Sequence, residues 1–353
     1  MPNKGVAATK FEHWLITLRA PRMGGTRLIG LLDSLGGIER VVSADRAALK
    51  RAGLDDDSIQ VLRNPDPGLL ASDLEWANQP GHHLVTWDSE QYPALLRDVP
   101  SPPAALFVDG DPEVLWQPQI AMVGSRNPTR GGVDHAKSFA TELSRRGLTI
   151  TSGMASGIDS EAHQAALAAG GFTVAVTGTG VDRVYPASGT LLAGKISRQG
   201  ALVSEFPLGT APRREHFPSR NRIISGLSLG VLVVEAGLNS GTLITARIAG
   251  NQGRDVFAIT GSIHNPMAKG GPRLLREGAR LVENVNQIIE EIAPMAGQLA
   301  GQLQSQLAGP EPAKLEEPGK GPQFDDDPEY QRLWSCLSFD PKPVDAIIEQ
   351  SGL

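Results

Sequence analysis

Short apolar runs alternate with amphipathic stretches between residues 120 and 292, and this alternation is the main structural signal in the chain. Each run has three or four residues, as expected of strands covered on both faces, and the stretches between them have helical spacing. Because right-handed crossovers join such strands, the pattern predicts an α/β fold, an extended Rossmann-like doubly wound sheet that is mostly parallel. The expected strands are Ile120–Val123, Thr149–Thr151, Thr173–Val176, Ala201–Val203, Val231–Val234, Val256–Ile259 and Arg280–Val282.

The N-terminal region, residues 1–72, contains short amphipathic segments and is expected to form a separate helical domain. Two of its segments flank a glycine-rich turn at residues 20–25, and Arg27 lies in the first turn of the second segment. This arrangement resembles helix-hairpin-helix and SAM-like modules, whose turn amides can contact a phosphate. A plain helical protein-interaction module is the open alternative.

Residues 73–292 are expected to form one domain, whose proline-rich beginning supplies Leu84–Trp87 and Ala104–Val108 as edge strands. The last expected helix of this domain is Asn284–Ile292. Residues 293–327 are rich in glutamine, proline and acidic residues, which predicts a flexible linker. Two short helices are expected in residues 328–353, a segment too small to hold a core alone.

The formal net charge of −6 argues against a nucleic-acid partner until the charge is divided by region. Residues 120–290 contain 18 Lys and Arg against 12 Asp and Glu. Residues 1–119 contain 11 against 16, and residues 291–353 contain 4 against 11. The basic excess lies in the predicted Rossmann domain, which favours a local surface for a polyanion.

Cys336 is the single cysteine, so the chain can form no intramolecular disulfide, and a reducing compartment is expected. The first 20 residues mix charged with apolar side chains and lack a signal-peptide pattern. No apolar run has the length of a membrane span. These features predict a cytoplasmic protein without membrane insertion.

Glycine, serine and threonine follow five of the expected strands, where open parallel sheets bind their ligands. Such residues expose backbone N–H groups and let a ligand approach the main chain closely. With Arg126 among them, they predict a binding edge at the carboxyl ends of the strands. The candidates on this edge are Gly124, Ser125, Arg126, Gly153, Met154, Gly157, Gly178, Gly180, Ser240, Gly241 and Thr242.

Arg220, Asn221 and Arg222 place two guanidinium groups around one amide in a segment that is otherwise apolar. Buried arginines need negative partners, and Glu205 and Glu215 do not lie at helical i,i+4 spacing from Arg222. The segment therefore predicts a polyanion site that shares the same edge. A structural ion pair at the start of a helix is the alternative.

Standard nucleotide-binding and catalytic motifs are absent. The sequence has no P-loop, and Gly178-Thr179-Gly180 lacks the third glycine of a dinucleotide fingerprint. No histidine pair with a third ligand has metal spacing. Asp159 and His163 are four residues apart and are interpreted as a structural cap and pair rather than an acid–base couple. No catalytic residue, metal or cofactor is expected.

Several motifs together resemble the DNA-processing protein A (DprA, also called Smf) family over residues 10–290. They are Val123-Gly124-Ser125-Arg126, Ser152-Gly153-Met154-Ala155-Ser156-Gly157-Ile158-Asp159, Gly178-Thr179-Gly180-Val181-Asp182, Ser204-Glu205-Phe206-Pro207, Phe217-Pro218-Ser219-Arg220-Asn221-Arg222 and Ser240-Gly241-Thr242. The resemblance implies a non-enzymatic protein that binds single-stranded DNA, protects incoming DNA and loads the RecA recombinase during natural transformation and recombination. It also implies a SAM-like N-terminal domain, a homodimer formed through the later part of the Rossmann domain, and often a C-terminal winged helix.

The resemblance also assigns expected roles to individual residues. Arg126, Gly153, Asn221 and the two arginines beside Asn221 fall on the strand-binding pocket of the family. Arg126 and Arg220 or Arg222 are expected to hold phosphates, the glycine turns to supply N–H groups, and Phe206 or Phe217 to stack on a base.

The chain also departs from the family pattern. Ala187-Ser188-Gly189 stands where the family usually has polar contacts, and residues 328–353 resemble the start of a winged helix without its recognition helix or wing. An alternative function is a nucleoside-monophosphate phosphoribohydrolase-like Rossmann enzyme, because Glu235 with Ser240-Gly241-Thr242 partly resembles the glycine-rich signature of those enzymes. The spacing of that signature fails here.

Overall fold

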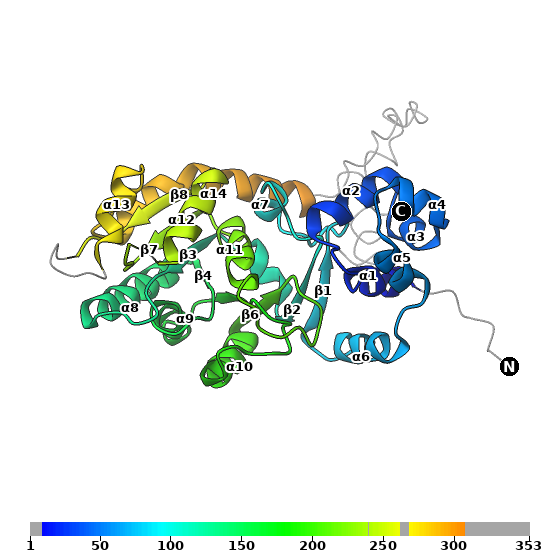
Figure 1. Cartoon of the computed structure of the whole chain (residues 1–353). Helices are drawn as coiled ribbons and strands as arrows, with labels where there is room; N and C mark the ends of the chain where they lie inside the picture. Colours follow the sequence, from blue (N-terminus) through cyan, green and yellow to red (C-terminus); the bar gives the residue numbers. More distant parts are fainter. Residues whose placement is uncertain (1–8, 239, 262–267, 308–353) are drawn as a thin grey trace, which may run out of the picture. The chain divides into compact units, whose positions relative to one another are not determined.

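The computed structural model describes residues 9–238, 240–261 and 268–307. Residues 1–303 form one compact unit and residues 304–353 a second unit. A nine-stranded sheet runs through the first unit in the order β1-β2-β6-β5-β4-β3-β7-β8-β9 (Figure 1). Its strands are β1 (His82–Thr86), β2 (Ala105–Gly110), β3 (Gln119–Val123), β4 (Thr149–Ser152), β5 (Thr173–Val176), β6 (Gly200–Ser204), β7 (Gly230–Val233), β8 (Asp255–Ala258) and β9 (Arg280–Leu281).

The pairing of these strands confirms the predicted mixed α/β fold with a mostly parallel sheet. β3 to β9 pair in parallel, whereas β1 and β2, the two strands expected in the proline-rich segment, are antiparallel at one edge. The chain moves outward from β3 to β6, and then returns to add β7 on the other side of β3. The carboxyl ends of β3 and β7 therefore form the topological switch point, where doubly wound sheets bind ligands.

Helices cover both faces of the sheet, because alternate strand residues point in opposite directions. Ala121 and Val123 pack with one layer, and Ile120 and Met122 pack with the other. The first layer contains α7 (Ala94–Arg97), η1 (Pro112–Trp116), α11 (His216–Leu227), α12 (Thr242–Asn251) and α13 (Gly270–Arg276). The second contains α8 (Arg130–Arg145), α9 (Ile158–Ala168), α10 (Thr190–Gln199), preceded by η2 (Ala187–Gly189), and α14 (Val285–Leu307).

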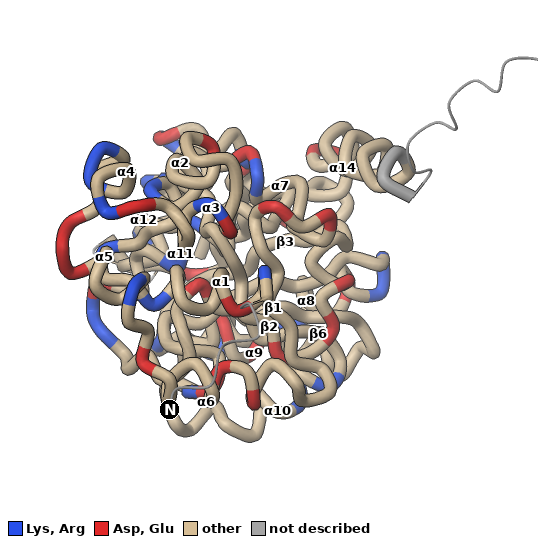
Figure 2. The backbone as a smooth tube through the Cα atoms, turned by 90° about the vertical axis from the view of Figure 1, so that its right-hand side faces the viewer, with Lys and Arg blue, Asp and Glu red and all other residues tan. Residues whose placement is uncertain are grey.

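Six helices precede the sheet: α1 (Lys10–Leu18), α2 (Gly25–Leu35), α3 (Ile38–Ser43), α4 (Arg46–Arg51), α5 (Asp56–Arg63) and α6 (Pro67–Ala77). The first five enclose a core of their own around Trp14 and Leu28. Acidic and basic residues are mixed over them (Figure 2), and Arg46 pairs with Asp56 at 2.7 Å. Helix α6, whose N-cap is Asp66, crosses the expected boundary after residue 72 and continues to Ala77.

The turn between α1 and α2 packs against the backbone of the segment that precedes β2. A Cβ atom on Gly25 would lie 2.0 Å from the carbonyl oxygen of Pro102, so only glycine lets the turn approach that backbone. Arg22, in the same turn, pairs with Asp55 and Asp57 at 2.9 Å each. The cation of the turn is therefore already balanced by two carboxylates.

The flexible linker expected from residue 293 does not begin there, because α14 continues to Leu307. Its apolar positions Ile288, Ile292, Met295 and Leu299 keep helical spacing and pack on the layer that contains α8 and α9. This burial holds the helix together across Pro294, which lacks one backbone donor. The remainder of the expected linker and the whole winged-helix segment, residues 328–353, lie outside the described residues. No helix in the described ranges is long and apolar enough to cross a membrane.

Candidate nucleic-acid interface

Hydrogen bonds between loops join the carboxyl ends of β3, β4 and β7 into one edge. The N–H of Ser125 donates to the carbonyl of Glu235 at 2.8 Å, and the hydroxyl of Thr242 donates to the carbonyl of Gly124 at 3.0 Å. A Cβ atom on Gly157, which has a φ of 82°, would lie 2.3 Å from the carbonyl oxygen of Ser125. Glycine at position 157 thus lets the loop after β4 lie directly on the loop after β3.

Gly153 is held on both sides of its peptide backbone. Its N–H donates to the buried carboxylate of Asp159 at 3.2 Å, and its carbonyl accepts a hydrogen bond from the guanidinium of Arg220 at 2.6 Å. The next residue, Met154, takes a left-handed backbone with a φ of 59° and buries its side chain. The loop after β4 is therefore fixed in a conformation that its own residues would rarely adopt.

Arg220 is buried with 5% of its surface exposed, and it does not reach the solvent edge. It donates to the carbonyls of Gly153 and Val176, which end β4 and β5. Burial lowers the pKa of Arg220 to about 10, and the charge of Asp159 opposes this shift, so the group stays charged at neutral pH. In this arrangement Nη1 of Arg220 fixes two strand ends, and Nε donates to Asn221.

The predicted pairing of Asp159 with His163 is wrong. Asp159 accepts hydrogen bonds from the N–H groups of Gly153 and Ala155, as a capping carboxylate does. His163 lies 2.6 Å from the hydroxyl of Thr173 through its Nδ1, and burial lowers its pKa to about 3. Both side chains therefore support the loop and sheet from inside.

Arg222 forms an ion pair with Glu205, which confirms the alternative interpretation for this residue. The guanidinium lies 2.5 Å from the carboxylate, and the two side chains are 16% and 13% exposed. Burial raises the pKa of Glu205, and the charge of Arg222 opposes that shift. The partners are 17 residues apart in the chain, so a search for acidic residues at helical i,i+4 spacing from Arg222 could not find Glu205.

Arg126 is exposed and forms no ion pair with any residue that the structure describes. It follows Ser125 at the switch point, and its carbonyl lies against Gly157. Nearby, the N–H groups of Ser156 and Gly157 donate to no acceptor within the described part of the chain. An exposed guanidinium beside open amides has the donor pattern that binds a phosphate group.

Aromatic side chains lie at the ends of β5 and β6. A Cβ atom on Gly178 would come within 3.1 Å of the Phe217 ring, so Gly178 lets that ring lie over the end of β5. Phe206 stacks on His216, with ring centroids 4.1 Å apart. Both predicted stacking residues are thus at the binding edge, and both contact other rings.

The remaining candidates have mainly structural contacts. The N–H of Gly180 donates to the carbonyl of Thr210 at 3.0 Å, and Asn221 accepts a hydrogen bond from Nε of Arg220 at 3.2 Å. The hydroxyl of Ser240 donates to that of Thr242 at 2.9 Å. Gly241 precedes α12 and is exposed.

Four basic residues near this edge were missed by the sequence prediction. Three lie in the loops after β5 and β6 and one is the first residue of α8, and all are exposed without an ion pair to a described residue. Sequence reasoning could have identified them, because each one falls in the segment between a predicted strand and the helix that follows it. These residues are Arg130, Arg183, Arg213 and Arg214.

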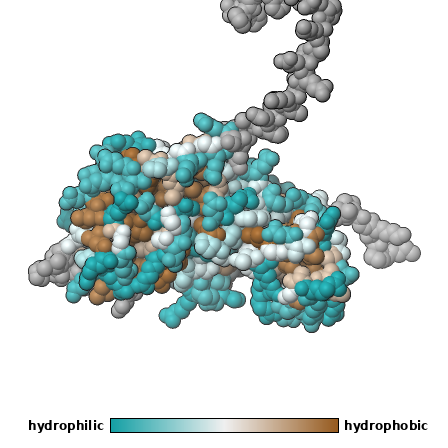
Figure 3. Space-filling model, turned by 90° about the horizontal axis from the view of Figure 1, so that it is seen from above, coloured by the Kyte–Doolittle hydropathy of each residue, from teal (hydrophilic) through white to brown (hydrophobic). Residues whose placement is uncertain are grey.

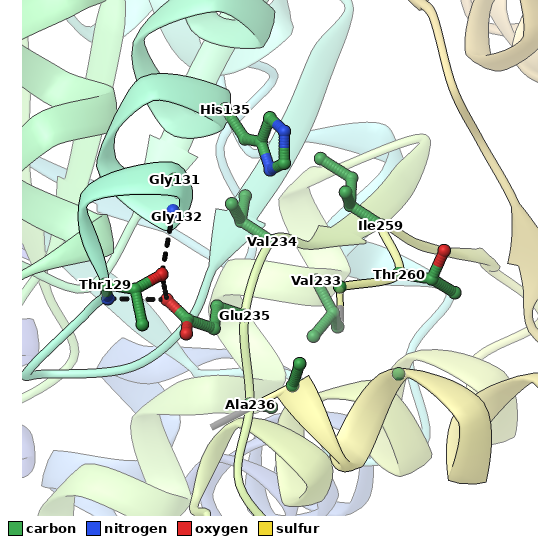
Figure 4. A pocket seen from close by; sticks show the side chains of 13 residues that line it. Thr129, Gly131, Gly132, His135, Val233, Val234, Glu235, Ala236, Ile259 and Thr260 are labelled. Atoms are coloured by element: carbon green, nitrogen blue, oxygen red, sulfur yellow. Dashed lines mark hydrogen bonds between the residues drawn. The ribbon is translucent and has the colours of Figure 1, made fainter. Parts of the chain in front are cut away.

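A cavity of about 220 Å³ lies next to this edge, between β7, β8 and the start of α8 (Figure 4). The carboxylate of Glu235 accepts hydrogen bonds from the N–H of Thr129 at 2.9 Å and from its hydroxyl at 3.3 Å. Glu235 therefore anchors the first turn of α8, which is a structural role. None of the predicted site residues lines the cavity.

The doubly wound, mostly parallel sheet with helices on both faces defines an α/β protein of the Rossmann-like class. The family model for DNA recombination-mediator protein A matches residues 83–293, and the chain belongs to this family. Protein Smf of Escherichia coli is 40% identical over 342 residues, which cover 97% of this chain and 88% of that protein. The DNA processing protein DprA of Bacillus subtilis is 42% identical over 70% of this chain and 82% of its own length.

Two solved structures have the same fold. DNA processing protein A from Streptococcus pneumoniae has a TM-score of 0.71 at 31% identity and covers 81% of this chain and 99% of its own. The protein from Helicobacter pylori, described for its single-stranded DNA binding mode, has a TM-score of 0.54 at 27% identity. It covers 60% of this chain and 96% of its own.

Replacing Arg222 by alanine is expected to destabilise the fold by about 3 kcal/mol, because the carboxylate of Glu205 would remain buried without its partner. Replacing both residues, as Glu205→Leu with Arg222→Met, is expected to recover most of this loss. Urea unfolding of the two variants measures the difference. An Arg222→Ala variant that is as stable as the wild type would contradict the structural role of the ion pair.

Proposed function

We propose that the chain binds single-stranded DNA along the carboxyl edge of its sheet, through the loops that follow β3 to β6. Arg126 and the N–H groups of Ser156 and Gly157 hold phosphates, and Phe217 contributes a ring for base contact. Arg220 acts from inside, as the residue that fixes the loop after β4. The bound strand is protected and passed to the RecA recombinase during transformation and recombination.

The exposed Arg126 beside two open amides is the observation that carries this proposal. The buried cations near this edge already have partners, as Arg222 has in Glu205 and Arg220 in two carbonyls. Arg130, Arg183, Arg213 and Arg214 extend the unpaired positive charge along the same edge. A DNA backbone fits such a row better than a single small anion, because successive phosphates can each meet a cation. The Helicobacter pylori relative, described for binding single-stranded DNA, supports this ligand.

The proposal includes two protein partners, RecA and a second copy of this chain. The end of the sheet supports self-association, because β9 is an edge strand whose Leu281 is 47% exposed. Ile244 on α12 and Leu238 are also exposed, and Figure 3 shows apolar residues on the surface at the end of the molecule that holds α13. Sedimentation that finds only monomers at micromolar concentration would contradict the homodimer. A RecA ATPase rate that stays unchanged when the single-stranded DNA is first covered by this protein would contradict the loading of RecA.

Arg126→Ala is expected to weaken the binding of a single-stranded thymidine oligonucleotide by about 10- to 100-fold, the loss of one charge-assisted contact. It is also expected to lower the slope of log affinity against log salt concentration by about 0.7, because one fewer phosphate is neutralised. Fluorescence anisotropy across a salt series measures both quantities.

Arg145→Ala is the matched control, because Arg145 is exposed and unpaired among the described residues but lies at the opposite end of α8. Its affinity and salt slope are expected to stay near those of the wild type. Equal losses in both variants would indicate a general charge effect and would contradict a binding site at the switch point.

A further inference from the structure

Two ring pairs lie at the ends of β5 and β6, and they differ in the surface that they leave exposed. Phe206 and His216 are nearly parallel, with planes 20° apart, so each ring covers a face of the other. Tyr185 meets Phe217 at a tilt of 47° with centroids 5.5 Å apart, and 49% of Tyr185 is exposed. Tyr185 therefore offers ring surface to a ligand, whereas Phe206 and His216 largely occupy each other.

Phe217, the ring behind Tyr185, is fixed by its surroundings. Gly178 lets it lie on the end of β5, where a Cβ atom would come within 3.1 Å of its edge. The guanidinium of the buried Arg220 lies 6.0 Å from the ring centroid on the same helix. A rigid partner reduces the conformational entropy that Tyr185 would lose when a ligand covers it.

The chemistry around Tyr185 selects the kind of ligand. The Tyr185 ring can stack on planar, uncharged groups. The exposed Arg183 lies two residues before Tyr185 in the chain. Neighbouring parallel strands are about 4.8 Å apart, so the end of β5 lies about 10 Å from the loop that carries Arg126. A ligand that spans both positions needs an anionic backbone and planar rings, and single-stranded nucleic acid has both.

We propose that Tyr185, supported by Phe217, is a base-stacking residue of the single-stranded DNA path, and that Phe206 is not. This inference rests on the proposed function and assigns phosphate contacts and base contacts to different loops. The loops after β3 and β4 hold phosphates, and the loop after β5 holds a base. Stacking of this kind tolerates every base, because each has a planar face.

The test compares two ligands of equal length, a thymidine oligonucleotide and an abasic strand with the same phosphates and no bases. Tyr185→Ala is expected to weaken binding of the oligonucleotide by about 5- to 150-fold, the range for loss of one stacking ring, and to leave the abasic strand unaffected. Tyr185→Phe is expected to keep wild-type affinity, because the hydroxyl takes no part. Phe172→Ala is the matched control, since Phe172 is 47% exposed directly before the amino end of β5.

Tyr185→Leu keeps apolar volume against Phe217 and removes the ring, so it provides a second variant if the alanine variant does not fold. Equal losses on both ligands would assign Tyr185 a structural role in its loop and overturn the inference. Unchanged binding of both ligands by the alanine and leucine variants would also overturn it. A wild-type protein that binds neither ligand would instead overturn the proposed function itself.

Discussion

One buried arginine holds the binding edge of this protein together. Arg220 reaches from α11 to the carbonyls of Gly153 and Val176, and so it ties the ends of β4 and β5 to a helix on one face of the sheet. On the other side of this peptide backbone, Asp159 accepts a hydrogen bond from the N–H of Gly153. A buried charge without such partners would cost several kcal/mol, so the cation and the two strand ends stabilise each other. The open amides of Ser156 and Gly157 keep their position because of this arrangement.

The arginines considered for the binding edge consequently divide into two groups. Arg220 and Arg222 are inside, where Arg220 donates to two carbonyls and Arg222 pairs with the carboxylate of Glu205. Arg126 and the other edge arginines are outside and carry the unpaired charge. The net charge of −6 hides this arrangement, because acidic residues are concentrated in the flanking regions. A DNA backbone would meet the outer group and would depend on the inner group for the shape of the loops.

The sheet and the glycine-rich loops at the carboxyl ends of its strands could be predicted from sequence, because short apolar runs and the glycines after them are local signals. Arg126 followed from the same reasoning. The contacts of Arg220 could not be predicted, since its carbonyl partners are 67 and 44 residues away in the chain. Pairing of Arg222 with Glu205 likewise depends on how β6 and α11 come together. The last helix was expected to end at Ile292, but the buried apolar positions up to Leu299 continue it past Pro294.

The affinity of an Arg220→Lys variant for single-stranded DNA shows whether Arg220 acts by fixing the ends of β4 and β5. Lysine keeps the positive charge, but its side chain is shorter and ends in one nitrogen, so it lacks the guanidinium in which Nη1 donates to both carbonyls while Nε donates to Asn221. If Arg220 acts by fixing the strand ends, the folded variant loses most of its affinity although its net charge is unchanged. Affinity equal to that of the wild type would mean that charge alone matters at this position. It would contradict a role for Arg220 in fixing the strand ends.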